Sequence, residues 1–320
     1  MAGITLIIVS GGDIASVVQG EALLELGQWR SGSEVEQQAS WSLENVRIWW
    51  RDGFVLEEDH LDRRWNEATG EEVAEIIFPS RHSAASGYPC LTVHPIGVPG
   101  LDPSQTPPYG GRPGRAPPPS PRLSAWLKAI SAMVVSTGLE ERYAVTLETT
   151  HHGPWLDVPS LFIEIGSTED QWDDREAAAG LAQVIWSGLG LDGGNGAGIW
   201  EPALQVGTRV AVTLGGGHYA PQPNRLASKG VWLGHMLANY AMPMEKTGDE
   251  VTADPETWPS GRWKESILEA VESTRSAYRG ADVWVYLDRK SFRGWQRRAI
   301  LHMLEAEGIQ CGRTRDFLPR

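Results

Sequence analysis

Five of the eight histidines lie in or beside segments rich in glycine, proline, serine and acidic residues, where a side chain rarely serves packing alone. His151 and His152 follow a strand-like run at 143–149 and precede a Gly-Pro turn, and His218 follows a second strand-like run and three glycines. Adjacent side chains on a strand point to opposite sides, so one of the paired histidines can face a cleft while the other orients the loop, unless the strand has already turned. The five histidines are His82, His94, His151, His152 and His218.

Glu164 is a carboxylate in the middle of an apolar strand-like run. Leu161, Ile163 and Ile165 occupy one face of this run and Glu164 the other. A buried carboxylate without a partner is unfavourable, so Glu164 requires a metal ion, an arginine or a proton. Two interpretations remain open: a salt bridge across the sheet, or a role at an active site as metal ligand or base.

Two or three histidines and a carboxylate, with no cysteine nearby, form the ligand set of a catalytic zinc that keeps one position open for water. We predict that zinc is bound by some of His94, His151, His152, His218 and Glu164. We assign the catalytic roles to Glu164, His152 and His82. No HExxH motif is present, so the prediction requires residues far apart in sequence to meet in space.

Other catalytic schemes have weaker support. The sequence contains no GxSxG elbow, and Ser167 precedes a helix-like segment in a way that suits capping as well as nucleophilic attack. The glycine-rich stretch 188–198 follows a helix-like segment instead of joining a strand to a helix, which favours a flexible turn over a phosphate-binding loop.

Strand-like and helix-like segments alternate along the chain and must position these residues. The alternation predicts an α/β fold with a single mixed, largely parallel sheet and helices on both faces, in one domain covering residues 1–320. Residues 99–121 hold nine prolines and four glycines in 23 positions, which predicts a surface insertion. The strands are expected at 4–9, 143–149, 161–167, 208–214 and 282–287, and the helices at 122–136, 169–187, 229–241, 262–279 and 291–307. Thr168 is expected to cap the helix at 169–187, with Gln171 three residues on, and His235 to pack within the helix at 229–241.

The formal net charge of -13 argues against a general nucleic-acid binder, so any contact with RNA must be local. One candidate is the basic segment, which we define as Arg289, Lys290, Arg293, Arg297 and Arg298. A solvated helix face is the alternative. Two cysteines without CxxC spacing, an apolar start without a basic region before it, and no long apolar run predict a cytoplasmic protein with no membrane partner.

Seven blocks, most of them centred on histidines, occur in the order 78–83 (FPSRHS), 91–95 (LTVHP), 149–154 (TTHHGP), 164–169 (EIGSTE), 215–221 (GGGHYAP), 234–235 (GH) and 287–298 (LDRKSFRGWQRR). In this order they resemble the archaeal- and plant-type D-aminoacyl-tRNA deacylases, the family that includes the plant GEKO protein. The similarity runs from about residue 78 to the C-terminus and is looser over residues 7–26. Two features depart from the family pattern: the length of the insertion at 99–121, and Val98, where a polar residue is expected near His94.

The resemblance implies a zinc-dependent esterase that removes D-amino acids from the 3′ end of tRNA, on a fold similar to phosphorylases and peptidyl-tRNA hydrolases. It also makes the basic segment a contact for the acceptor end of tRNA, on a monomer with no DNA partner. Two alternatives belong to other classes: a metallohydrolase of small esters or peptides, which the acidic composition favours, and a non-catalytic RNA- or nucleotide-binding module.

Overall fold

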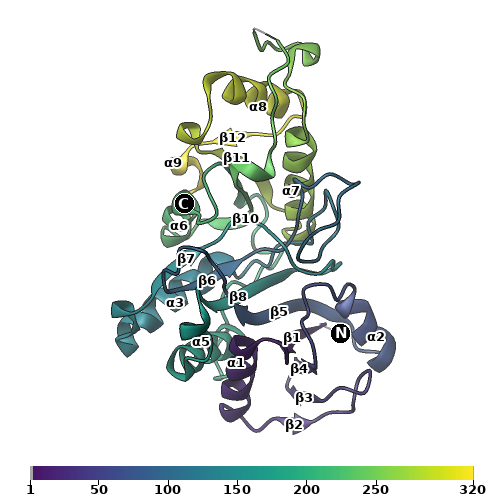
Figure 1. Ribbon diagram of the computed structural model, residues 1–320, viewed down its shortest axis with the longest axis vertical. Helices are drawn as coiled ribbons and strands as arrows, with labels where there is room; N and C mark the ends of the chain where they lie inside the picture. Colours follow the sequence, from purple (N-terminus) through teal and green to yellow (C-terminus); the bar gives the residue numbers. More distant parts are fainter. Residues whose placement is uncertain (1–2, 249, 320) are drawn as a thin grey trace.

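The computed structural model describes residues 3–248 and 250–319 and has an α/β architecture built on two sheets (Figure 1). The first sheet has eight strands in the order β2-β3-β4-β1-β5-β8-β6-β7. Strands β4, β1, β5 and β8 run parallel, whereas β2 and β3 are antiparallel to their neighbours and β6 is antiparallel to β8. The predicted mixed, largely parallel sheet is therefore confirmed. Its strands are β1 (Ile4–Ser10), β2 (Arg30–Ser31), β3 (Ser40–Leu43), β4 (Val46–Arg51), β5 (Val73–Arg81), β6 (Cys90–His94), β7 (Ala144–Leu147) and β8 (Ser160–Gly166).

The prediction of a single sheet was wrong, because the later strands form a second, parallel sheet in the order β10-β9-β11-β12. This sheet buries its own apolar cluster, which includes Val212, Ile267 and Ile300 from a strand and two helices. The second sheet meets the first through helix packing and loops: α3 (Leu123–Thr137) packs against α6 (Pro221–Ser228) and β10, whose apolar residues join the core of the first sheet, and an isolated bridge links Glu148 to Tyr219. The strands are β9 (Arg209–Leu214), β10 (Trp232–Leu237), β11 (Asp282–Leu287) and β12 (Cys311–Gly312).

Helices cover both faces of the first sheet, as predicted. Helices α1, α3 and α5 pack together on one face, and α2 lies against β5 on the other (Figure 1). Among the described residues, no helix is long and apolar enough to cross a membrane. The helices are α1 (Ile14–Glu25), α2 (Leu61–Thr69), α3 (Leu123–Thr137), α4 (Glu169–Trp172), α5 (Arg175–Gly188), α6 (Pro221–Ser228), α7 (Trp263–Ala277), α8 (Gly294–Ala306) and α9 (Thr314–Phe317). Short 3-10 turns occur at Leu139–Glu141, Asn239–Ala241, Pro255–Thr257 and Arg289–Ser291.

Two expected helices differ from the structure. The segment predicted as a helix at 169–187 begins with the expected Thr168 and Gln171 capping box, but it is divided into α4 and α5. The break occurs because the carboxylate of Asp174 accepts hydrogen bonds from two following backbone N–H groups and so starts a new helix. The segment predicted as a helix at 229–241 contains strand β10, whose short apolar run is buried on both sides and therefore shows no helical periodicity to distinguish it.

The insertion at 99–121 is only partly a surface loop. Residues 102–106 are exposed, but Ala116, Pro117, Pro119 and Ser120 are buried between the two sheets. The backbone carbonyls of Ala116 and Pro117 accept hydrogen bonds from Ser273 of α7 and His235 of β10, respectively. Proline limits the backbone N–H groups that such a segment must satisfy when it is buried.

Candidate active site

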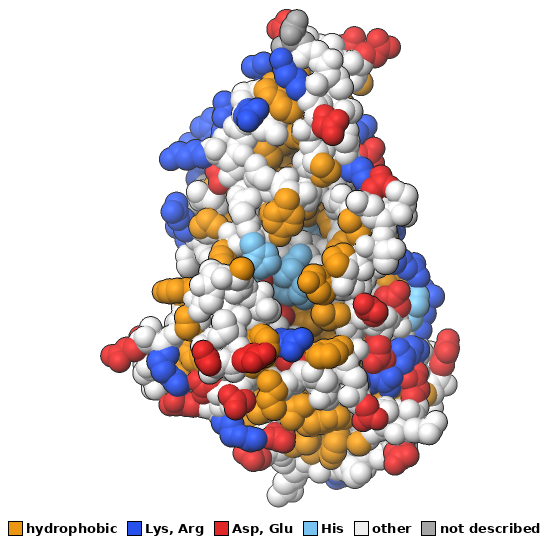
Figure 2. Space-filling view, in the orientation of Figure 1, with side chains coloured by type: hydrophobic (Ala, Val, Ile, Leu, Met, Phe, Trp, Pro, Cys, Tyr) orange, Lys and Arg blue, Asp and Glu red, His pale blue; other side chains and the backbone are white. Residues whose placement is uncertain are grey.

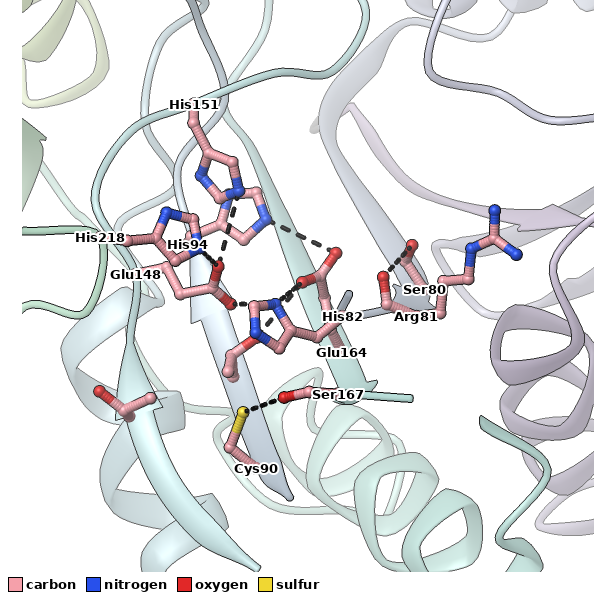
Figure 3. Close-up of polar contacts among 12 residues, drawn as sticks. Ser80, Arg81, His82, Cys90, His94, Glu148, His151, Glu164, Ser167 and His218 are labelled. Carbon is pink, nitrogen blue, oxygen red and sulfur yellow. Dashed lines mark hydrogen bonds and ion pairs between the residues drawn. The ribbon is translucent and has the colours of Figure 1, made fainter. Parts of the chain in front are cut away.

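All five predicted histidines and Glu164 lie in one group together with Glu148, in which both glutamates, His82 and His94 are buried and the other histidines are partly exposed. Figure 3 labels the residues of this group except His152. We call this group the histidine–glutamate cluster, and it lies where the two sheets meet. Glu164 projects from β8 on the face that also carries Phe162, whereas Leu161, Ile163 and Ile165 pack toward α1, α3 and α5. The cluster consists of His82, His94, His151, His152, His218, Glu148 and Glu164.

Strand ends and loops bring these side chains together. His94 is the last residue of β6, His82 directly follows β5, and Glu148 directly follows β7. His218 comes from the second sheet, in the loop after β9. The backbone N–H of Thr149 donates to the carbonyl of His218 at 2.9 Å, and this bond fixes the loop beside Glu148.

His151 and His152 lie on the same side, because β7 has already ended at Leu147. Their ring centroids are 4.1 Å apart, and those of His94 and His151 are also 4.1 Å apart. His152 has a backbone φ of 27°, a value that residues other than glycine rarely adopt. This backbone conformation brings both adjacent imidazoles toward His94, and such conformations concentrate at functional sites.

Glu148 is the central carboxylate and the main residue that the sequence did not single out. It is fully buried, and its oxygens lie 3.1 Å from Nδ1 of His82, 3.5 Å from Nε2 of His151 and 2.6 Å from Nε2 of His218. Burial opposes its ionisation, but contacts with His218 and His82 outweigh burial and hold the pKa of Glu148 well below its ordinary value. Glu148 is therefore an anion that joins histidines from both sheets.

Glu164 is the second buried carboxylate. Its oxygens lie 3.5 Å from Nδ1 of His82 and 3.6 Å from Nε2 of His94, and it accepts a hydrogen bond from the Thr92 hydroxyl. Burial would raise its pKa, but the charge of His94 and contact with His82 lower it. Among the described ion pairs its partners are His82 and His94, and the pair with His94 joins β8 to β6, so Glu164 makes an ion pair across the sheet as well as lying in the candidate site.

Four of the histidines divide into two pairs by the direction in which their pKa is shifted. Burial lowers the pKa of His82, but contacts with Cys90 and the two carboxylates outweigh burial and raise it above its ordinary value. The pKa of His94 is raised in the same way, against burial, by Glu164. Burial and neighbouring imidazoles hold the pKa of His151 well below its ordinary value and lower that of His152 to about 4. The two carboxylates therefore raise the pKa of the rings beside them, His82 and His94, whereas burial and neighbouring imidazoles lower the pKa of His151 and His152.

The donor atoms of the cluster fit a bound metal ion. Nδ1 of His94 and Nδ1 of His151 donate to backbone carbonyls, of Pro95 and Thr149 respectively, which leaves each Nε2 available. Nε2 of His94, Nδ1 of His152 and oxygens of both glutamates are buried without a hydrogen-bond partner. Because Nε2 of His94 faces a carboxylate oxygen, a proton or a metal ion between them is required. The ligand atoms of His94, His151 and His152, and those of His94, Glu148 and Glu164, lie within 4.8 Å of one another.

A cavity of about 480 Å³ opens onto the cluster. Figure 2 shows histidine side chains at the bottom of a hollow in the middle of this face, with hydrophobic side chains around it. His94 and Glu148 lie behind the lining, so the cavity wall presents the other five members of the cluster. These five are His82, His151, His152, His218 and Glu164.

The basic segment lies outside this cavity, on the half of the molecule that contains the second sheet. It spans the 3-10 turn at Arg289–Ser291 and the start of α8, and Figure 2 shows Lys and Arg side chains gathered along one edge of this half. The Arg297 guanidinium donates to the carbonyls of Arg289 and Phe292, whereas the other four cations are exposed. Asn239 joins this turn to the His218 loop, since it accepts from the N–H of Gly216 and donates to the carbonyl of Ser291.

Sequence reasoning missed several residues of the site. Glu148 had a local signal, a carboxylate three residues before His151, but that signal has no meaning until the segments after β7 and β9 are brought together. Tyr219 follows the predicted His218 but was not predicted to be part of the site; its hydroxyl lies 3.0 Å from Nε2 of His82. Ser167 donates to the carbonyl of Tyr88 and does not line the cavity, which gives no support to serine catalysis.

Comparisons with known proteins agree with this geometry. A family model described as D-aminoacyl-tRNA deacylase matches residues 69–312. A D-aminoacyl-tRNA deacylase of Arabidopsis thaliana is 42% identical over 317 residues, which cover 98% of this chain and 99% of the relative. One from Methanosarcina mazei is 33% identical over 313 residues, covering 95% of this chain and 90% of the relative. A crystal structure of a conserved protein of unknown function, AF0625, is 25% identical with a TM-score of 0.75, covering 99% of this chain and 97% of that one. The chain therefore belongs to the D-aminoacyl-tRNA deacylase family.

Proposed function

We propose that this protein hydrolyses the ester between a D-amino acid and the 3′ end of tRNA, which returns mischarged tRNA to translation as a quality-control step. Family membership supports the reaction. The observation that carries the chemistry is the histidine–glutamate cluster at the bottom of a single cavity. An aminoacyl ester is already activated, so hydrolysis needs a positioned water, a group that takes its proton, and donors for the developing oxyanion.

The residues of the cavity wall can meet these needs. Glu164 and the neutral ring of His152 are the proposed proton acceptors, because both line the cavity. His82 is the proposed donor, since contacts with two carboxylates keep it protonated and oriented. Proton transfer of this kind typically contributes roughly 10²–10⁴-fold to a rate.

Zinc is the proposed cofactor. Ligands would come from His94, His151, His152, His218 and Glu164, and we add Glu148 to the proposed set because it neighbours three histidines. When bound, zinc would polarise the ester carbonyl and lower the pKa of a bound water. Binding would displace protons held by the ligands, so the affinity for zinc is expected to fall as the pH is lowered.

We propose that the basic segment contacts the acceptor end of tRNA. Its exposed cations form no ion pair with an acid among the described residues, so they are free to contact phosphate. The link through Asn239 places this segment beside the loop that carries His218. A local contact of this kind is compatible with the overall charge of -13, because only one end of the RNA has to be bound.

The test is release of amino acid from D-aminoacyl-tRNA and L-aminoacyl-tRNA, each with and without a chelator, beside a small amino-acid ester. We expect hydrolysis of the D-aminoacyl-tRNA, a lower rate on the L-aminoacyl-tRNA and loss of activity in chelator. Equal or greater activity on the small ester would favour the small-ester metallohydrolase. Binding of tRNA without any release of amino acid would favour the non-catalytic module.

A further inference from the structure

The cavity that opens onto the histidine–glutamate cluster has a second wall of aromatic side chains. Phe54 and Tyr109 line it and remain 56% and 61% exposed. The chain has five phenylalanines, and the other four are buried, so the exposure of Phe54 departs from the pattern of this protein. Flat apolar side chains exposed inside a cavity indicate a ligand with a flat apolar face. The buried phenylalanines are Phe78, Phe162, Phe292 and Phe317.

A cation lies beside this aromatic wall. The guanidinium of Arg81, also a cavity residue, lies 4.9 Å from the ring centroid of Phe54 and 4.7 Å from that of Trp172. Two aromatic rings therefore hold it by cation–π interaction. In Figure 3 the Arg81 side chain extends away from the cluster, so the cation lies on the side of the cavity remote from the reacting ester.

No carboxylate neutralises Arg81 by an ion pair within the described residues. The nearby carboxyl of Asp13 is saturated instead, because it accepts hydrogen bonds from the Ala15 and Ser16 N–H groups, the Ser80 hydroxyl and the Arg81 backbone N–H. The guanidinium thus keeps its charge and its donors for an anion. Planar guanidinium donors match phosphate oxygens well.

We propose that Phe54 and Arg81 bind the unpaired 3′-terminal nucleotide of tRNA, with Phe54 stacking on the base and Arg81 contacting the 5′-phosphate of that nucleotide. The inference rests on the proposed function and deepens it. The ribose that carries the ester is covalently joined to both the base and the phosphate, so both must lie within a few bonds of the ester, in or beside the cavity that holds it. Stacking on aromatic side chains together with a cation on the backbone is the usual way in which single-stranded RNA is bound. If Phe54 contacted the amino-acid side chain of the substrate instead of the base, Arg81 would have no anion to bind.

The kinetic test compares three substrates that lose one part at a time: D-aminoacyl-tRNA, 3′-O-D-aminoacyl-adenosine without phosphate, and the methyl ester of the same D-amino acid. Phe54→Ala is expected to lower kcat/KM for the two substrates that contain the terminal base, D-aminoacyl-tRNA and aminoacyl-adenosine, by roughly tenfold or more relative to kcat/KM for the methyl ester. Phe54→Trp should restore most of this loss. Arg81→Gln should lower kcat/KM for aminoacyl-tRNA relative to both phosphate-free substrates. Leu204→Ala and Arg175→Gln are matched controls, since both side chains are exposed elsewhere and neither lines the cavity.

Equal losses on all three substrates would overturn the proposal, because they would mean that Phe54 supports the fold or holds the amino acid. A binding measurement separates this failure from failure of the proposed reaction. Calorimetry should detect adenosine 5′-monophosphate binding to the wild type, weakened at least roughly tenfold in Phe54→Ala and in Arg81→Gln. Wild-type protein that binds the mononucleotide but releases no amino acid would retain the nucleotide site and refute the reaction. Equal binding by wild type and both variants, or none by the wild type, would refute the site.

Discussion

Acidification from pH 7 to pH 5 is expected to cost the folded protein about 2 kcal/mol through His235 alone. This ring is completely buried in β10, and burial lowers its pKa from 6.5 to about 3. Its Nε2–H donates to the carbonyl of Pro117 at 3.0 Å, and its Nδ1 accepts from the Thr150 hydroxyl at 3.0 Å. The neutral ring is therefore fully paired, and it joins the 99–121 segment, the second sheet and the residue before His151.

The direction and size of the effect follow from proton linkage. Between pH 6.5 and about 3 the unfolded chain binds a proton at His235 and the folded chain does not, so stability falls as the pH falls through this window. One pH unit is worth about 1.4 kcal/mol, and pH 5 lies about 1.5 units below the unfolded pKa. Little of the effect is present at pH 7, because the unfolded ring is mostly neutral there.

Urea unfolding of the wild type and His235→Gln, followed by tryptophan fluorescence at both pH values and constant ionic strength, isolates this contribution. All other titrating groups are shared, so the wild type should lose about 2 kcal/mol more than the variant between pH 7 and pH 5. The glutamine amide can donate to the Pro117 carbonyl as the ring does. An equal pH dependence in the two proteins would refute the reasoning and show that the folded protein accommodates the charged ring.

Substitutions and metal analysis test the site in other ways. Glu164→Gln should lower kcat by roughly 10²–10⁴-fold with little change in KM if Glu164 is the base. It should lower zinc content together with activity if Glu164 is a ligand, and a normal kcat would remove it from the mechanism. Elemental analysis should find zinc in the purified protein, whereas metal-free protein that stays fully active in chelator would exclude it. Substituting the exposed cations of the basic segment with glutamine should raise KM for aminoacyl-tRNA. Each lost phosphate contact should also reduce the salt slope of binding by roughly one, and unchanged values would place the RNA elsewhere.

Long segments with a strong local pattern were predictable from the sequence. Strands β1, β8, β9 and β11 and helices α3, α7 and α8 lie close to their expected ranges, because each has enough apolar residues at one period. Strand β10 was mistaken for a helix for the opposite reason. Its apolar run is short, and Gly234 packs so closely on Thr274 that a Cβ atom would lie 2.3 Å from that side chain.

The division into two sheets could not be predicted, since alternating strands and helices fit one sheet or two equally well. Strands β4, β5 and β6 were also not predicted, although His82 and His94 depend on the last two of them. The histidines were nevertheless found because their residue type is uncommon and their loops are rich in glycine and proline. Glutamate is common, so Glu148 gave no such signal.

The position of the cluster explains why its members are so far apart in sequence. Glu148 and His151 follow a strand of the first sheet, His218 lies in the loop after a strand of the second, and Glu148 contacts His218 across the junction. An apolar cluster also joins the two sheets, since the core around α3 includes Leu226 of α6 and Met236 of β10, and the histidine–glutamate cluster adds polar contacts of specific geometry to this junction. Buried polar contacts require specific geometry and lose most of their value when it changes. The residues proposed for catalysis therefore also fix the junction, and substitutions in the cluster should be measured for both folding and turnover.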